Sequence, residues 1–94
     1  MVIEATPDSD AAIRRRWGKN LAETMAAQDI TPKRLVIEMA MLGVDINTSS
    51  ISQWTKGDNA PGPSKMIALA RVLRVPPRML FSLDIEVIRQ AEAA

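Results

Sequence analysis

The sequence predicts an all-α domain of five to six short helices, and three observations lead to this prediction. The 94-residue chain has few aromatic residues, and its apolar content is mainly Ala, Leu, Ile, Val and Met, which favours helices over strands. Apolar residues recur every four positions near the N-terminus. Two Thr-Pro pairs precede expected helices, where threonine can cap the free amides and proline fits the first turn.

The chain is expected to form a single domain with one hydrophobic core, because 94 residues leave little room for more. Residues 1–7 show no periodicity and predict a flexible N-terminal arm, and residues 8–83 predict the folded domain. Residues 84–94 predict a C-terminal tail. Ile85, Val87 and Ile88 fit either a frayed sixth helix or an added strand in this tail.

The first helix is expected from about residue 8 to residue 28, with Thr6 and Pro7 at its start. Its buried face is the stripe with four-residue spacing, namely Ile13, Trp17, Leu21 and Met25. Gly18 costs about 1 kcal/mol relative to alanine inside a helix, so we interpret it as the site of a close helix contact. Cations beside the stripe fit either a phosphate backbone or a solvated face: Arg14, Arg15, Arg16 and Lys19.

Later segments predict four more helices. The second runs from Thr31-Pro32 to about residue 42, where Gly43 ends it, and Val44 or Ile46 should pack between helices in the turn that follows. After residues 48–56, a loop over 58–63 precedes a fourth helix to residue 73 and a short fifth helix from residue 77 to about 82. The expected core residues are Leu35, Met39 and Leu42 in the second helix, and Met66 or Ile67, Leu69, Ala70 and Leu73 in the fourth.

Residues 48–56 predict a short helix with two unlike faces. Asn47 or Thr48 can cap its start, and Gly57 suits its end. Ile51 and Trp54 lie three residues apart and share one side, so both are predicted to be core residues. The other side carries short uncharged hydrogen-bonding groups, at Thr48, Ser49, Ser52 and Gln53. Such a helix suits the major groove of DNA, although a capped surface helix rich in Ser and Thr explains these residues equally well.

Charge and composition exclude several kinds of protein. Residues 14–83 hold eleven Lys and Arg against five Asp and Glu, giving +6, a basic region compatible with DNA binding. The chain has no His and no Cys, which removes the commonest general base, the commonest zinc ligand and any disulfide. Because Glu23, Glu38 and Asp45 lack the spacing of a metal site, we expect no enzyme activity, no metal and no cofactor.

The chain also lacks sequence signals for a membrane or for export. Nothing resembles a signal peptide, and no apolar run approaches the roughly 20 residues that span a bilayer. We therefore expect a cytoplasmic protein that has no membrane partner and no small-molecule ligand.

Four fragments in order resemble the Cro/CI-repressor (Xre-type) helix-turn-helix family, which has the lambda-repressor-like fold. They are the start of the second helix (30–35), the third helix with its closing glycine (51–57), the fourth helix (63–64 and 69–75) and the short fifth helix (76–81). The resemblance covers about residues 17–83. One departure is that the chain is several residues longer than the family unit between Thr31 and Ile51, within residues 39–47. That insertion leaves open how the third helix is presented.

The resemblance implies a sequence-specific regulator that binds double-stranded DNA, such as a phage or mobile-element repressor or a Cro-like protein, and that is associated with the nucleoid through DNA. The third helix would read bases with Thr48, Ser49, Ser52 and Gln53, and Gln53 could pair bidentately with adenine. The candidate backbone contacts are Thr31, Lys33, Lys56, Asn59 and Arg15. The alternative is a helical protein–protein interaction module, such as an antitoxin or adaptor, on the same fold.

A homodimer is expected, at least on DNA, because one such unit contacts few bases and tight binding needs two copies on a pseudo-palindromic operator. The expected interface is the fifth helix with the tail, whose apolar residues exceed what a short terminal segment needs to cover itself. Its residues are Met79, Leu80, Phe81, Leu83, Ile85, Val87 and Ile88. The N-terminal arm with residues 14–16 offers another interface or a second DNA contact.

Overall fold

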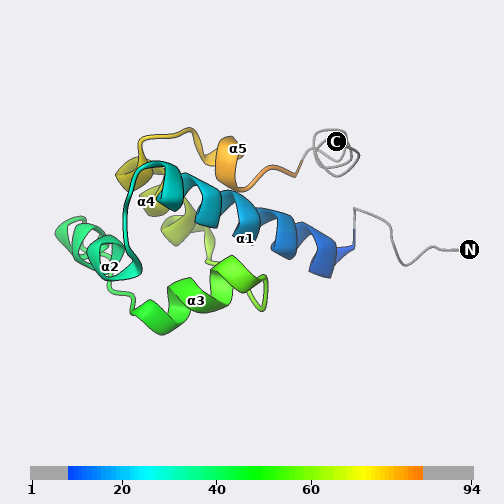
Figure 1. Ribbon diagram of the computed structural model, residues 1–94, viewed down its shortest axis with the longest axis horizontal. Coiled ribbons are helices and arrows are strands. Elements are labelled where there is room, and N and C mark those ends of the chain that lie inside the picture. The colour runs from blue at the N-terminus through cyan, green and yellow to red at the C-terminus, as the bar shows by residue number, and fades with distance from the viewer. Residues whose placement is uncertain (1–8, 84–94) are drawn as a thin grey trace, which may run out of the picture.

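The computed structural model describes residues 9–83, which form five α-helices (Figure 1). They are α1 (Asp10–Ala27), α2 (Pro32–Met41), α3 (Thr48–Lys56), α4 (Pro63–Leu73) and α5 (Pro77–Leu80). Helix α1 passes through the middle of the molecule, with α3 on one side of it and α5 on the other. The all-α prediction is confirmed, and no strand occurs within residues 9–83. The predicted arm and tail lie outside the described residues.

The first three helices each begin with a side-chain oxygen that accepts a hydrogen bond from a first-turn amide. The oxygen and amide residues are, in order, Ser9 and Ala12, Thr31 and Arg34, and Asn47 and Ser50. Thr31 therefore caps α2 as predicted, and Asn47 is the cap of α3. Helix α1 begins at Asp10, two residues later than predicted, because Ser9 caps it. Thr6 and Pro7 lie outside the described residues.

The first four helices end in the same hydrogen-bonded turn. A residue in the left-handed conformation follows each helix, and the amide of the next residue bonds to a carbonyl oxygen five positions earlier, as in a Schellman motif. The left-handed residues are Asp29 (φ 58°), Gly43 (φ 80°), Gly57 (φ 81°) and Arg74 (φ 60°). Gly43 and Gly57 are the two glycines that the sequence predicts at helix ends.

Arg74→Gly is expected to stabilise the protein by about 0.5–1 kcal/mol. A residue with a Cβ atom loses about 1–2 kcal/mol in the left-handed region, and the larger entropy of glycine in the unfolded chain offsets part of the gain. Arg74 is exposed, so little packing is lost. Urea denaturation measures the change. Arg71→Gly is the control, because Arg71 lies in the last turn of α4 and its replacement should destabilise by about 1 kcal/mol. A lower midpoint for Arg74→Gly would contradict this explanation.

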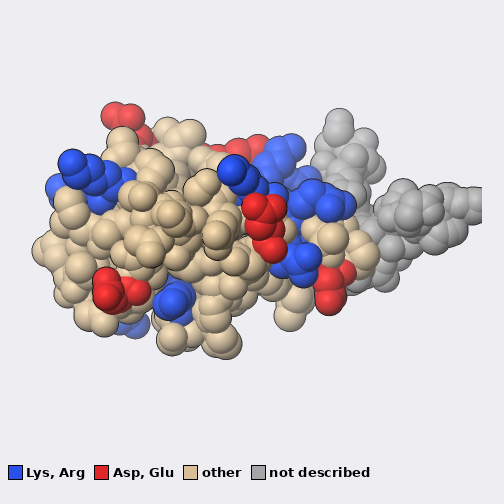
Figure 2. Space-filling model, turned by 90° about the horizontal axis from the view of Figure 1, so that it is seen from below, with Lys and Arg blue, Asp and Glu red and all other residues tan. Residues whose placement is uncertain are grey.

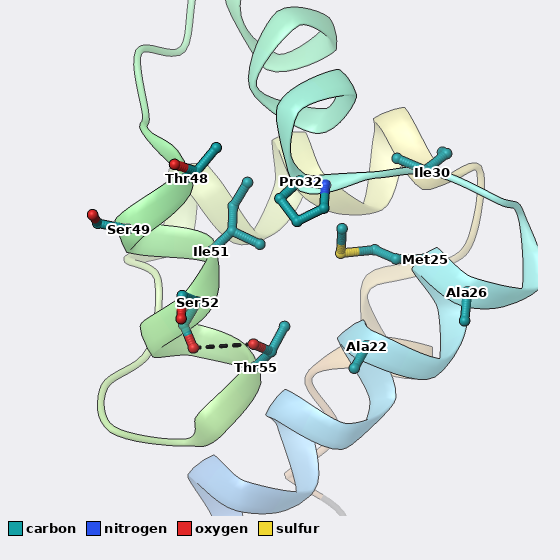
Figure 3. A pocket seen from close by; sticks show the side chains of 10 residues that line it. All are labelled: Ala22, Met25, Ala26, Ile30, Pro32, Thr48, Ser49, Ile51, Ser52 and Thr55. Carbon is teal, nitrogen blue, oxygen red and sulfur yellow. Dashed lines mark hydrogen bonds between the residues drawn. The ribbon is translucent and has the colours of Figure 1, made fainter.

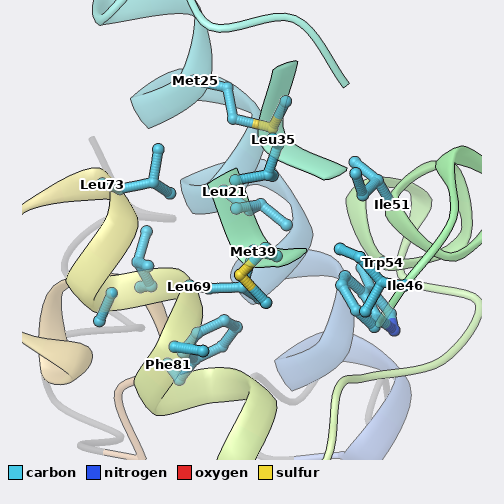
Figure 4. Packing of buried hydrophobic residues seen from close by; sticks show 13 residues of the cluster. Leu21, Met25, Leu35, Met39, Ile46, Ile51, Trp54, Leu69, Leu73 and Phe81 are labelled. Carbon is cyan, nitrogen blue, oxygen red and sulfur yellow. The ribbon is translucent and has the colours of Figure 1, made fainter. Parts of the chain in front are cut away.

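The hydrophobic core lies where the five helices meet (Figure 4). Most predicted core residues are buried, and Ile46, in the turn before α3, is buried as one of the two alternatives foreseen there. Leu42 is 44% exposed, so its prediction as a core residue is wrong. The reason is that α2 ends at Met41, and Leu42 belongs to the capping turn, where the helical spacing no longer sets the direction of a side chain. Met66 and Ile67 were alternative predictions for one core position in α4. Met66 is partly buried against the core, whereas Ile67 is 53% exposed.

Helix α5 is fixed to α1 by three contacts. Trp17 donates its indole N–H to the carbonyl oxygen of Ser82 over 2.8 Å, and Asn20 Nδ2 donates to the carbonyl oxygen of Leu80 over 3.2 Å. The rings of Trp17 and Phe81 meet edge to face, with centroids 5.7 Å apart. Trp17 therefore packs at the junction with α5 and is only half-buried.

This arrangement corrects the predicted dimer interface. Leu80 and Phe81 are buried in the core of their own chain, because α1 covers them, and they are not available to a partner. Met79 and Leu83 are exposed, at 61% and 70%. Ile85, Val87 and Ile88 lie outside the described residues.

Candidate nucleic-acid interface

Helices α2 and α3 are joined by a connection of six residues, 42–47. The extra length that the sequence places in residues 39–47 therefore lies in the connection, and α2 stops at Met41. The connection is fixed at three points: the amide of Val44 donates to the carbonyl oxygen of Met39, Ile46 is buried, and Asn47 caps α3. A longer turn thus still holds the start of α3 in one position.

Helix α3 has the two faces that the sequence predicts. Ile51 and Trp54 are buried, at 1% and 6% exposure, and both belong to the core. The residues predicted to read bases are all exposed, namely Thr48, Ser49, Ser52 and Gln53. They form an outward surface without charge, which we call the reading face.

The backbones of α1 and α3 touch at Gly18. A Cβ atom at this position would lie 2.4 Å from the carbonyl oxygen of Trp54 and 2.6 Å from that of Thr55, closer than nonbonded atoms can approach. The close helix contact predicted for Gly18 is confirmed, and its partner is α3. Because no side chain separates the two helices here, α1 directly sets the position of α3.

Basic side chains gather at the C-terminal end of α3. Arg14 Nε donates to the carbonyl oxygen of Gly57 over 3.3 Å. Arg15 is also close, because a Cβ atom added to Gly57 would lie 2.8 Å from the Cα atom of Arg15. Lys56 occupies the last turn of α3. Figure 2 views the molecule from the side of α3 and shows Lys and Arg side chains gathered over this region, with acidic groups among them. Arg15 and Lys56, both predicted backbone contacts, are exposed here.

The N-terminal half of α3 borders a hollow of about 640 Å³ between α1, the start of α2 and α3 (Figure 3). Met25, Pro32 and Ile51 converge on its floor, and Thr48, Ser49 and Ser52 of α3 also line it. The two remaining candidates, Thr31 and Lys33, flank Pro32, which lines this hollow at the start of α2. Thr31 is exposed but its hydroxyl oxygen caps α2, and Lys33 is exposed in the first turn.

The structure brings Asn59 to the reading face. Asn59 Nδ2 donates to Gln53 Oε1 over 2.9 Å, although the sequence prediction treated the two as separate contacts with backbone and base. The sequence analysis grouped Arg14 with three neighbouring cations and gave it no separate role. Its bond to the carbonyl oxygen of Gly57 depends on how α1 packs against the end of α3. Residues 9–83 contain no group of three acidic side chains that could hold a metal ion, and none of their helices is long and apolar enough to cross a membrane.

Comparison with known proteins identifies the same unit. The family model described as Helix-turn-helix matches residues 39–80, from the last turn of α2 to the end of α5. No curated protein and no solved structure matches the chain significantly. The matched segment contains the connection, α3, α4 and α5, whereas α1 and most of α2, the helices that contact α3, precede it. The match, which spans 42 of the 94 residues, supports the resemblance to Xre-type helix-turn-helix proteins of the Cro and CI kind, and a helix-turn-helix unit is typical of DNA-binding transcription regulators.

Proposed function

We propose that the protein is a sequence-specific regulator that inserts α3 into the major groove of double-stranded DNA. The observation that carries this proposal is the reading face, an exposed and uncharged hydrogen-bonding surface on a helix whose other side is locked into the core. Amide and hydroxyl groups can distinguish base edges in the major groove, and a fixed helix presents them in a constant geometry.

The flanking residues support a backbone role. Arg15 and Lys56 lie at the C-terminal end of α3. Thr31 and Lys33 lie at the start of α2, on either side of Pro32, which lines the hollow between α2 and α3. Cations on either side of an uncharged reading face would contact phosphates and fix the register of the helix in the groove. Such contacts make affinity fall with salt, with a slope of about −0.9 per phosphate contact.

We further propose that the protein represses transcription in a phage or mobile element, or acts as a Cro-like protein, as a homodimer on a pseudo-palindromic operator. One copy of the reading face reaches few base pairs, and a two-fold pair doubles that number. Of the residues expected at the interface, Met79 and Leu83 are the ones exposed in the described part of the chain.

Selection of binding sites from a random DNA pool at two salt concentrations tests this function. We expect a two-fold-related motif whose enrichment weakens as salt rises. Gln53→Ala should cost about 1–3 kcal/mol and relax the preference at one base pair of each half-site. Lys56→Ala should weaken binding to all sequences and reduce the salt slope by about 0.9. Arg78→Ala is the matched control, because this exposed cation lies in α5, on the opposite side of α1.

Each outcome bears on a different part of the proposal. A single enriched half-site would keep the regulator and remove the dimer. The absence of any enriched sequence at moderate salt would contradict base reading and favour the alternative, a helical module that binds another protein.

A further inference from the structure

Helix α3 ends with the same turn as its neighbours but with different side chains. After α1, α2 and α4, the residue that follows the left-handed position is apolar and packs against the core: Ile30, Val44 and Val75. An apolar contact of this kind commonly accompanies a Schellman motif. In α3 the two residues joined by the motif are Gln53 and Asp58, and both are exposed and polar. The side chain of Gln53 is therefore directed away from the core.

Asn59 takes the place of the missing apolar contact. Its Nδ2 donates to Gln53 Oε1 over 2.9 Å, and it lies in a loop whose backbone is tied down. The amide of Asp58 donates to the carbonyl oxygen of Gln53 over 3.0 Å, and Arg14 Nε donates to the carbonyl oxygen of Gly57 over 3.3 Å. Pro61, two residues later, is buried. These contacts hold the backbone next to Asn59, and the Asn59 side chain donates to the amide oxygen of Gln53.

We infer that Asn59 is a specificity-determining residue that acts through Gln53. This inference rests on the proposed base reading by α3. With Oε1 held toward Asn59, the Nε2 group of Gln53 points to the other side and offers a hydrogen-bond donor. A donor selects bases whose facing major-groove atom is an acceptor, such as guanine O6 and N7 or thymine O4. Asn59 thereby limits the bases that Gln53 can select, because a glutamine without such a partner could present either its amide oxygen or its amide N–H group.

Asn59→Asp is the variant that tests this role most sharply, because a carboxylate accepts hydrogen bonds and does not donate them. The Gln53 amide should turn over to donate Nε2–H to the new carboxylate and present Oε1 outward. The favoured base should then change to one that offers a donor, cytosine N4 or adenine N6. We expect the ratio of affinities for the two base types to change by about tenfold or more at that position. Preferences at the other positions are the internal control for the added negative charge.

Two further variants separate orientation from simple loss of contact. Asn59→Ala removes the donor, so the preference at the same base pair should relax without reversing. In the double variant Gln53→Ala with Asn59→Asp, the base preference should equal that of Gln53→Ala alone, because the effect of residue 59 passes through Gln53. Without DNA, the NMR signals of the Gln53 side-chain amide should shift in Asn59→Asp, since its N–H groups gain an acceptor. Circular dichroism confirms that the variants fold.

The outcomes distinguish this inference from the proposed function. If the wild-type protein enriches no sequence, or if Gln53→Ala changes no preference, base reading by Gln53 fails and the inference fails with it. If Gln53→Ala relaxes one base pair but Asn59→Asp leaves the preference there as in the wild type, the inference alone is overturned. A reversal in Asn59→Asp that disappears in the double variant supports it.

Discussion

Trp54→Ala is expected to lower the free energy of unfolding by about 3–5 kcal/mol, the usual cost of removing a buried tryptophan. Trp54 is 6% exposed and packs in the core beside Ile51 and Ile46 on the inner side of α3. A domain of this size has about 5–15 kcal/mol of total stability, so the loss would leave it close to unfolding.

Urea denaturation followed by circular dichroism measures this change. Ser52→Ala is the matched control in the same helix: its side chain is exposed, so its replacement should change stability by no more than about 0.5 kcal/mol. A loss below about 1 kcal/mol for Trp54→Ala would show that the tryptophan is not a core residue.

Gly18→Val is expected to destabilise the protein by about 3 kcal/mol, the upper part of the range for overpacking. The new Cβ atom would lie 2.4 Å from the carbonyl oxygen of Trp54, and backbone atoms cannot move aside as a side chain does. Relief of the clash requires α3 to shift away from α1. Gly18→Ala should cost less, because alanine recovers about 1 kcal/mol of helix propensity.

Ala22→Val provides the control for Gly18→Val, because it introduces the same side chain one turn later in α1 at an exposed position. It should cost only the difference in helix propensity, less than about 1 kcal/mol. Thermal or urea unfolding compares the two variants. Equal losses would contradict the backbone contact, and a surviving Gly18→Val protein that binds DNA as well as the wild type would contradict its role in placing α3.

The features that depend on local chemistry could be predicted from the sequence. The bounds of α3, the cap at Thr31 and the left-handed glycines at 43 and 57 follow from short stretches whose hydrogen bonds close within a few residues. Asn47 was one of the two caps predicted for α3, beside Thr48. The inner pair Ile51 and Trp54 follows from the helical period alone.

The features that depend on distant segments could not be predicted. From the sequence, Leu80 and Phe81 were predicted to be an exposed apolar surface. In the structure they pack near Trp17 and Asn20 of α1, which lie about 60 residues earlier in the chain. The spacing of apolar residues in α2 likewise does not show that the helix ends at Met41, one residue before Leu42. At the candidate site, the exposure of the reading face could be predicted. The hydrogen bond from Asn59 to Gln53 could not, because it depends on the path of the loop after Gly57, which no residue pattern specifies.

The contact at Gly18 also determines how freely this protein can acquire new targets. Helix α3 is seated by main-chain atoms and by two inward side chains, so its outer residues contribute little to folding. Under the proposed function, substitutions at those outer positions would therefore alter DNA recognition without unfolding the domain. Two proteins descended from this chain could then bind different operators while they keep the same helical scaffold. By the same reasoning, another reading face could be engineered onto this scaffold by substitution of a few surface residues.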